Sequence, residues 1–309
     1  MISPMMSRRS LALLALAMPA FPAQALDLTD SVAPTKTLDR ARRLTVQVSI
    51  NKQGPYPFLI DTGSNASVIS SELAAQLNLP PGPRSRLHGI AGAELVDTVR
   101  VDSLAVGRRE RRGLTASVAA SRFMRVPGIL GQDWLGSQGL VLDFARNQMR
   151  VGSQIPRDDD LAVSVPVKAR RSGLHLIEGS VRETPVLVFL DTGSTTTGGN
   201  LALMEEAVRR RSVGRDWADI ELQSVTGQSM SGRLAALKSL KLGKMTLRNV
   251  PVVFGPVHTF NYWELADRPA ILVGNDVLNT FDSVALDFTR GQVHFRLSPP
   301  SAKRDAATS

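Results

Sequence analysis

Two stretches of the sequence decide the fold: LTVQVSINKQGPYPFLIDTGS at residues 44–64 and LHLIEGSVRETPVLVFLDTGS at residues 174–194. In each stretch the aspartate follows the opening leucine at the same spacing, and three apolar residues lead into Asp-Thr-Gly-Ser. Because two long segments match in order and spacing, we infer that the chain contains one structural unit twice.

The match continues downstream of these stretches. Each copy has a glycine after the aspartate motif, a second glycine that closes a Ser-Leu-x-apolar segment, an apolar-apolar-glycine element and a Leu-Asp-Phe triplet. The paired markers are Gly92 and Gly227, Gly107 and Gly243, residues 129–131 and 272–274, and residues 142–144 and 286–288. Their common order and nearly constant spacing favour two copies of one unit over a chance likeness.

The pattern inside each copy is typical of β-structure. Leu44, Val46, Val48 and Ile50 alternate with polar residues, which is the period of a half-buried strand. Further strands are expected at residues 58–60, 95–101, 113–118 and 149–152, and short helices at residues 71–77, after Gly131, at residues 204–211 and after Gly274. The sequence therefore predicts an all-β protein of two similar lobes with few short helices.

The first residues have the features of a secretory signal peptide. Arg8 and Arg9 precede a short apolar run, and Ala-Gln-Ala at residues 23–25 is a small-x-small cleavage site. The apolar run is too short to span a bilayer, and the arginine pair partly matches a twin-arginine signal. We expect a soluble exported protein, periplasmic or secreted, without a spanning membrane segment. An uncleaved N-terminal anchor is the alternative.

Composition changes along the chain suggest its boundaries. Residues 153–161 are polar and contain a proline, as expected of a connector between the two copies. The predicted organisation is a signal peptide at 1–25, an N-terminal segment at 26–41, a first lobe at 42–152, a connector at 153–164, a second lobe at 165–298 and a tail at 299–309.

Charge and cysteine content exclude several classes of function. The chain has no cysteine, which excludes disulfides, thiolate catalysis and cysteine-ligated zinc. Its formal charge is +9, with arginine clusters at residues 108–112 and 209–211. We interpret these clusters as solvated loop and helix faces, with attraction to an anionic envelope surface as the alternative. No nucleic-acid-binding motif is found, and no nucleic-acid partner is expected.

A strand that ends in Asp-Thr-Gly-Ser can present an oriented carboxylate. The glycine permits a sharp turn, its N–H and the serine hydroxyl can bond the carboxylate oxygens, and the threonine hydroxyl can tie one loop to its neighbour. Two such loops related by an internal twofold axis would bring Asp61 and Asp191 together. Carboxylates in contact share one proton, so the pair can supply both a general base and a general acid. The sequence does not fix which aspartate takes which role.

On these motifs the chain resembles the pepsin/retropepsin clan of aspartic proteases, in the form of a bacterial single-chain enzyme. The residues that carry the resemblance are Asp61, Thr62, Gly63 and Ser64, Asp191, Thr192, Gly193 and Ser194, and the elements at 129–131 and 272–274. The resemblance implies a bilobal acid-protease fold in which each element packs beneath its aspartate loop. It also implies an aspartic endopeptidase that hydrolyses peptide or protein substrates without cofactor or metal, as a monomer.

Residues 88–92, His-Gly-Ile-Ala-Gly, resemble the glycine-rich flap of retropepsins. The resemblance implies a hairpin in which Gly89, Ile90, Ala91 and Gly92 close over a peptide, and an ordinary glycine turn is the alternative. Residues 225–228 hold the equivalent place in the second copy, with weaker flap character.

Three features depart from the family pattern. The flap tyrosine of pepsin-like enzymes has no counterpart, because neither Tyr56 nor Tyr262 is near Gly89 in sequence. Gly198 and Gly199 replace an apolar pair after the second motif, which places the rigidity of that loop in question. Gly-Gln-Asp and Gly-Asn-Asp stand where retropepsins have Gly-Arg-Asn, so dimer contacts of the viral kind are not expected.

Other polar residues receive structural interpretations. Asp133 and Asp276 are assigned to helix starts, Asp143 and Asp287 to exposed strand positions, and Trp134 to the core. The four histidines show no pair at metal-ligand spacing, and no metal site is expected. A rival hypothesis for the whole chain is an exported peptide-binding or envelope scaffold that kept the fold and lost catalysis.

Overall fold

The computed structural model describes residues 30–32, 43–136, 139–152, 161–171 and 174–298. The predicted signal peptide, most of the N-terminal segment, most of the connector and the tail from residue 299 lie outside the described residues. Within the described part, none of the helices combines the length and the apolar character needed to cross a membrane.

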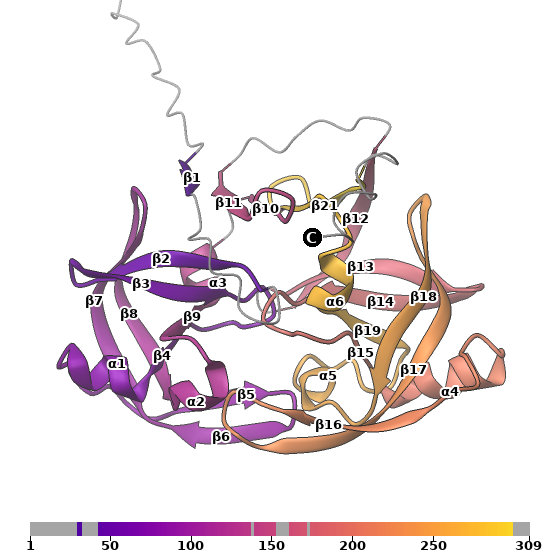
Figure 1. The fold of residues 1–309 in the computed structure, drawn as a ribbon, viewed down its shortest axis with the longest axis horizontal. Helices are drawn as coiled ribbons and strands as arrows, with labels where there is room; N and C mark the ends of the chain where they lie inside the picture. The colour runs from indigo at the N-terminus through magenta and orange to yellow at the C-terminus, as the bar shows by residue number, and fades with distance from the viewer. Residues whose placement is uncertain (1–29, 33–42, 137–138, 153–160, 172–173, 299–309) are drawn as a thin grey trace, which may run out of the picture.

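The first lobe is built on a closed six-stranded barrel (Figure 1). Its strands follow the order β2 (Thr45–Ile50), β3 (Gln53–Ile60), β9 (Gly128–Leu130), β4 (Val68–Ser70), β8 (Arg109–Ala119) and β7 (Thr98–Val106). Val46, Val48 and Ile50 of β2 are fully buried, as their alternation predicted. The barrel closes where β7 pairs with β2.

The second lobe repeats this order. Its strands are β13 (Leu174–Val181), β14 (Thr184–Leu190), β19 (Ala270–Val273), β15 (Gly198–Gly199), β18 (Met245–Phe254) and β17 (Ser229–Leu242). An additional pairing of β13 with β17, at Gly179 and Leu242, repeats the closure of the first barrel. The prediction of an all-β fold with two similar lobes is therefore confirmed.

A shared sheet joins the two lobes along one side of the molecule, at the top of Figure 1. Its strands run in the order β1 (Asp30–Val32), β11 (Gln148–Val151), β10 (Leu140–Asp143), β20 (Ser283–Asp287), β21 (Gln292–Arg296) and β12 (Ala162–Arg171). At its centre β10 and β20, the matching strands of the two copies, pair antiparallel. This pairing places the internal twofold axis between the lobes.

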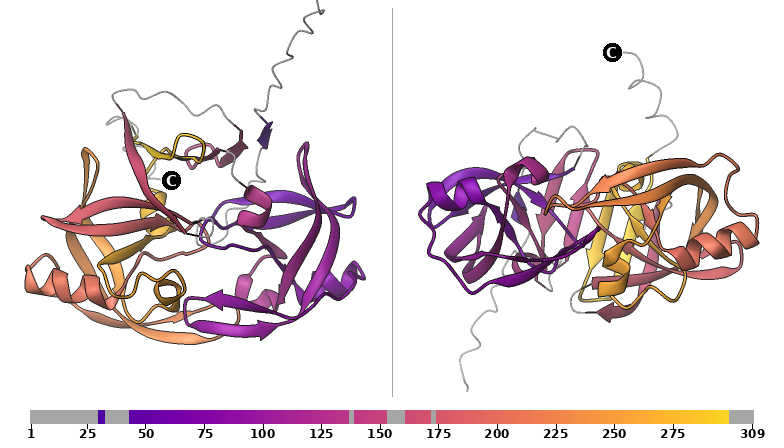
Figure 2. Two further views of the ribbon diagram at one scale, coloured as in Figure 1. Left: turned by 180° about the vertical axis from the view of Figure 1, so that it is seen from behind. Right: turned by 90° about the horizontal axis from the view of Figure 1, so that it is seen from below.

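Two hairpins cross the opposite side. One is formed by β5 (Ser85–Gly89) and β6 (Gly92–Val96) of the first lobe, and the other by β16 (Ala218–Gln223) and the start of β17. Figure 1 and the left view of Figure 2 show β6 and β16 side by side at the bottom of the molecule. The hairpins therefore span the two lobes on the side away from the shared sheet.

The helices are short, and matching side chains cap the two outer ones. They are α1 (Ser71–Gln76), α2 (Ser121–Met124), α3 (Gln132–Leu135), α4 (Leu201–Arg209), α5 (His258–Tyr262) and α6 (Asn275–Leu278). Ser70 accepts a hydrogen bond from the N–H of Leu73 at the start of α1, and Asn200 accepts one from Leu203 at the start of α4. The Asn200 cap starts α4 earlier than predicted, and neither α2 nor α5 was predicted.

The interpretation of Asp143 and Asp287 as exposed strand positions was wrong. These side chains are only 8% and 5% exposed. Each ends a central strand and accepts hydrogen bonds from the backbone N–H and the guanidinium of the arginine three residues later, Arg146 or Arg290. The carboxylates thus close the turns that follow β10 and β20. Trp134 is fully buried, as expected.

The arginine cluster at residues 108–112 is only partly a solvated face. Arg109 donates to the carbonyl of Leu135 at 2.9 Å, and Arg111 donates to that of Trp134 at 3.4 Å. The guanidinium of Arg109 also lies 4.9 Å from the centroid of the Trp134 ring. These carbonyls belong to the C-terminal end of α3, so the two arginines supply hydrogen-bond donors to that end of the helix.

Candidate active site

Asp61 and Asp191 follow the ends of the matching strands β3 and β14, and the two aspartate loops, residues 61–64 and 191–194, fold alike. Asp61 Oδ1 accepts the N–H groups of Gly63 and Ser64 at 2.8 and 2.9 Å. Asp191 Oδ1 accepts those of Gly193 and Ser194 at 2.9 and 3.0 Å. Two backbone donors therefore fix the orientation of each carboxylate.

The two loops face each other at close range. A Cβ atom added at Gly63 would lie 2.6 Å from Cγ of Asp191, and one added at Gly193 would lie 2.2 Å from Oδ2 of Asp61. Each glycine is thus needed because the opposite carboxylate occupies the space where a side chain would begin. The structure brings Asp61 and Asp191 together across the twofold axis.

The serine hydroxyls do not bond the carboxylates, and that part of the sequence interpretation was wrong. Ser64 Oγ donates to the carbonyl of Ala66, and Ser194 Oγ donates to that of Thr196, both at 2.8 Å. The serines orient the aspartates through their backbone N–H groups, while their hydroxyls hold the following residues in a tight turn.

The two threonines bridge the loops as expected. Thr62 Oγ1 donates to the carbonyl of Leu190, and Thr192 Oγ1 donates to that of Ile60, both at 2.7 Å. Each hydroxyl also accepts the backbone N–H of the other threonine, at 3.1 and 3.2 Å. This buried reciprocal network joins the two lobes directly beneath the carboxylates.

The apolar-apolar-glycine elements lie under the aspartate loops, as the family resemblance implied. Asp61 N–H donates to Leu130, and Asp191 N–H donates to Val273, at 2.9 and 3.0 Å. The next residues, Gln132 and Asn275, were not predicted to have a role. Gln132 Nε2 donates to the carbonyl of Thr62, and Asn275 Nδ2 donates to those of Thr192 and Ser194. Their matching places in the repeat are the sequence signal that could have identified them.

Asp133 and Asp276 lie in the first turns of α3 and α6, as expected, but they also hold the strands that leave the aspartate loops. Asp133 accepts the hydroxyl of Ser67, and Asp276 accepts that of Thr197, both at 2.7 Å. These carboxylates therefore belong to the support of the site.

Burial raises the pKa of both facing carboxyls. For Asp61 the negative charge of Asp191 adds to burial, and its pKa lies well above the ordinary value for aspartate. For Asp191 the donors of Ser194, the Asp61 carboxyl and the N–H of Gly193 offset part of the effect of burial. The pair therefore favours one shared proton and one negative charge.

The glycines after the second loop do not disrupt the sheet. Gly198 and Gly199 form β15, which is buried and pairs with both β18 and β19. In the first lobe β4 pairs in the same way with β8 and β9. The second aspartate loop is held by the same set of strand pairings as the first.

The predicted flap residues form the tip of the β5–β6 hairpin. Gly89 and Gly92 pair with each other, and a Cβ on either would meet the second hairpin, at Ser224 (3.1 Å) or Gln228 (3.0 Å). Ile90 and Ala91 pack against an apolar cluster of the second lobe. The hairpin tip is therefore docked onto the other lobe.

A cluster of side chains, which we call the clasp, holds this hairpin to α5: His88, His258, Tyr262 and Asn65. His88 Nδ1 and His258 Nε2 share a hydrogen bond of 3.0 Å, and the rings of His88 and Tyr262 are 4.0 Å apart between centroids. Asn65 Nδ2 donates to the Tyr262 hydroxyl at 2.9 Å, and His258 N–H donates to the carbonyl of Ile90. His88 and the α5 residues His258 and Tyr262, which lie far apart in sequence, thus meet at the flap.

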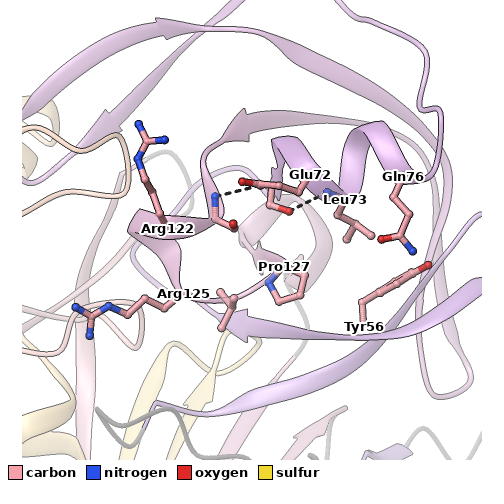
Figure 3. A pocket seen from close by; sticks show the side chains of 10 residues that line it. Tyr56, Glu72, Leu73, Gln76, Arg122, Arg125 and Pro127 are labelled. Atoms are coloured by element: carbon pink, nitrogen blue, oxygen red, sulfur yellow. Dashed lines mark hydrogen bonds between the residues drawn. The ribbon is translucent and has the colours of Figure 1, made fainter.

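A separate pocket of about 450 Å³ opens on the outside of the first lobe, beside α1 and α2 (Figure 3). Tyr56, Gln76 and Arg125 are among its lining residues, and Glu72 accepts the N–H of Ser121 there. None of the lining residues belongs to the aspartate loops. This pocket is therefore distinct from the candidate site.

Comparison with known proteins agrees with this geometry. A family model described as aspartyl protease matches residues 46–134 and 177–277, one range in each lobe and together more than half of the chain. A comparison with curated proteins finds no significant match. The chain belongs to the aspartyl protease family.

Proposed function

We propose that the chain is an aspartic endopeptidase in which Asp61 and Asp191 are the catalytic residues. The observation that carries the proposal is the facing pair of carboxylates, each fixed by two backbone donors and joined through the threonine network. One shared proton gives the pair a charged oxygen to take a proton from water and a carboxyl to protonate the substrate carbonyl. A peptide would lie between the loops and the two hairpins.

A single chain suffices for this chemistry, because each lobe supplies one aspartate. We propose that the enzyme acts as a monomer on peptide or protein substrates, after export and removal of residues 1–25. N-terminal sequencing of the exported chain tests the last point, and the expected first residue is Leu26.

The test of the activity is a pepstatin-sensitive cleavage assay with a peptide library from acidic to neutral pH. Asp61→Asn and Asp191→Asn should each lower kcat/KM by about 10³-fold or more, since each removes one partner of the acid–base pair. Asp97→Asn is the matched control, because the Asp97 side chain is 80% exposed. It should keep full activity.

The rival scaffold makes a different prediction. A scaffold would bind library peptides at some pH, show no turnover at any pH, and bind equally well after either aspartate is replaced. That result would end the proposal, as would full activity in either Asp→Asn variant. Circular dichroism of each variant checks that the fold is retained.

A further inference from the structure

Arg43 is a buried arginine that reaches from one lobe to the aspartate loop of the other. It directly precedes Leu44, whose carbonyl accepts the N–H of Ile60 next to Asp61. Its guanidinium donates to the carbonyl of Met124 in the first lobe at 3.2 Å and to that of Gly193 in the second lobe at 3.3 Å. The side chain therefore connects the body of the first lobe to the loop that holds Asp191.

Arg43 is only 8% exposed as a residue, and a buried positive charge is stabilised by negative charge nearby. Asp191 is 9% exposed, and the positive charge of Arg43 lowers its pKa, against the larger effect of burial. The carboxylate of Asp191 is thus one buried anion on which the charge of Arg43 acts.

The backbone does not distinguish the two carboxylates, since each accepts two N–H groups at nearly equal distances. A comparison of the two copies of the repeat shows a difference between the surroundings of Asp61 and Asp191. Residue 43 precedes the opening leucine of the first copy, and the residue in the same position of the second copy is Gly173, which has no side chain. The second copy therefore offers no arginine at this position to act on Asp61.

We propose that Arg43 is a positioning residue that makes the aspartate pair unequal, holding the negative charge on Asp191 and leaving the shared proton on Asp61. The inference rests on the proposed function for its catalytic consequence. Asp191 takes a proton from water as the water oxygen bonds to the carbonyl carbon. The carbonyl oxygen takes the proton of Asp61, which leaves a neutral gem-diol with Asp191 protonated and Asp61 charged.

Among the described residues, the two aspartates act on each other, and the charge of Arg43 acts on Asp191. Removing the charge of Arg43 should make ionisation of Asp191 harder, because an opposite charge at short range favours the charged form. The acidic limb of the rate profile should then move to higher pH. A loss of packing alone would lower the rate without moving that limb.

The test measures the titration of the Asp191 carboxyl by ¹³C NMR in an Asp61→Asn background, where it titrates without its partner. Arg43→Gln, which keeps hydrogen-bond donors, should raise the midpoint by about one pH unit. Arg43→Lys should restore most of the original value because it keeps the charge. Arg146→Gln, whose guanidinium pairs with Asp143, should leave the midpoint unchanged.

The companion measurement is the pH profile of kcat/KM with Asp61 in place, where Arg43→Gln should move the acidic limb upward by a similar amount. Arg43→Met is a second neutral variant in case Arg43→Gln does not fold. An unchanged midpoint in a folded neutral variant overturns the role of Arg43, even if the protein cleaves peptides. A shifted midpoint in a protein that cleaves nothing supports the role of Arg43 and rejects the proposed function.

Discussion

The strand that follows each aspartate loop has the same position in both lobes but a different sequence. The first lobe continues into Val68 and Ile69 of β4, and the second continues into Gly198 and Gly199 of β15. A Cβ at Gly199 would lie 2.8 Å from the ring of Phe254, which is buried on the neighbouring strand β18. Phe254 therefore fills volume that the missing side chain leaves. The comparison teaches that the repeat preserves strand pairing and packed volume, while the residue that supplies the volume can change.

The hairpins that lie over the two aspartate loops differ more between the lobes than the hydrogen bonds that hold the loops in place. The β5–β6 hairpin carries His88 and docks on α5, whereas the second hairpin meets it with Ser224 and Gln228. By contrast, the threonine network and the glycine contacts are almost the same in both lobes.

After the aspartates themselves, the largest effect is expected from the glycines that face the carboxylates. Gly63→Ala and Gly193→Ala should each lower kcat/KM by about 10²-fold or more, because the new Cβ would displace the opposite aspartate. Gly198→Ala is the matched control, since its nearest neighbour would be an atom 3.9 Å away. If only one of the two substitutions harmed activity, the carboxylates would not be positioned symmetrically.

The threonine network gives the next effect, on stability. Thr62→Val and Thr192→Val each remove a hydroxyl that donates to a buried carbonyl and accepts a buried N–H. Each should lower the free energy of unfolding by about 1–3 kcal/mol in urea titrations. The double variant should lose less than the sum, because both hydroxyls serve one network.

Thr195→Val is the control for this series. Thr195 lies in the exposed turn after the second motif, and its hydroxyl has a neighbour only at 3.4 Å, in Thr196. Its unfolding free energy should change little. Additive losses at Thr62 and Thr192 would contradict a shared network.

Local patterns were enough to predict the repeated lobes, the strand that carries each aspartate and the meeting of Asp61 with Asp191. These features depend on alternation, glycine positions and spacing, which are visible in a single sequence. The aspartate motifs also predicted the threonine tie, since a buried hydroxyl beside a second loop must find a partner. The serine hydroxyls were misassigned because backbone N–H groups supply the donors to Oδ1 of each carboxylate, and the hydroxyls donate to backbone carbonyls in the following turn.

The clasp, the role of Phe254 and the reach of Arg43 could not be predicted. His88 and His258 are far apart in the chain and meet only because the hairpin of one lobe crosses to α5 of the other. Asp143 and Asp287 looked exposed because they are charged, but the fold buries them in a sheet shared by both lobes. Such contacts follow from how the lobes pack together, and neither periodicity nor propensity contains that information.

The clasp makes the first hairpin sensitive to pH. Burial lowers the pKa of His88, and the nearby charges of His258 and Arg86 lower it further. The hydrogen bond between the histidines needs one neutral ring as acceptor. The clasp should therefore be complete above the ordinary histidine value of 6.5 and weaken as the pH falls below it.

Hydrogen exchange of residues 85–96 measures this opening. Exchange corrected for intrinsic rates should rise by about tenfold between neutral and mildly acidic pH, and the β16–β17 hairpin should respond less. In His88→Phe, which keeps a ring beside Tyr262, the pH dependence should disappear. An unchanged dependence in that variant would show that His88 does not hold the hairpin.

The smallest effect concerns the two outer helices. The Glu206 carboxylate on α4 accepts the hydroxyl of Thr184 at 2.6 Å and pairs with Arg209 and Arg210, and these contacts lower its pKa to about 2. A lowered pKa stabilises the fold above the ordinary glutamate value of 4.5, and this stabilisation is lost as the pH falls toward 2. Glu206→Gln should thus lower Tm at neutral pH by about 1–2 °C. The difference in Tm between the variant and the unaltered protein should disappear as the pH approaches 2.

Two controls refine this last comparison. Glu205→Gln, at the exposed neighbouring position of α4, should leave Tm unchanged at every pH. Glu72→Gln on α1 should give a smaller pH-dependent loss, because the exposed Glu72 carboxylate accepts hydrogen bonds from Ser71 and Ser121, whereas two arginines pair with Glu206. Equal losses at Glu72 and Glu206 would mean that the arginines of α4 add nothing. A loss at Glu206 that persisted at low pH would mean that the carboxamide disturbs packing and that the charge is not the cause.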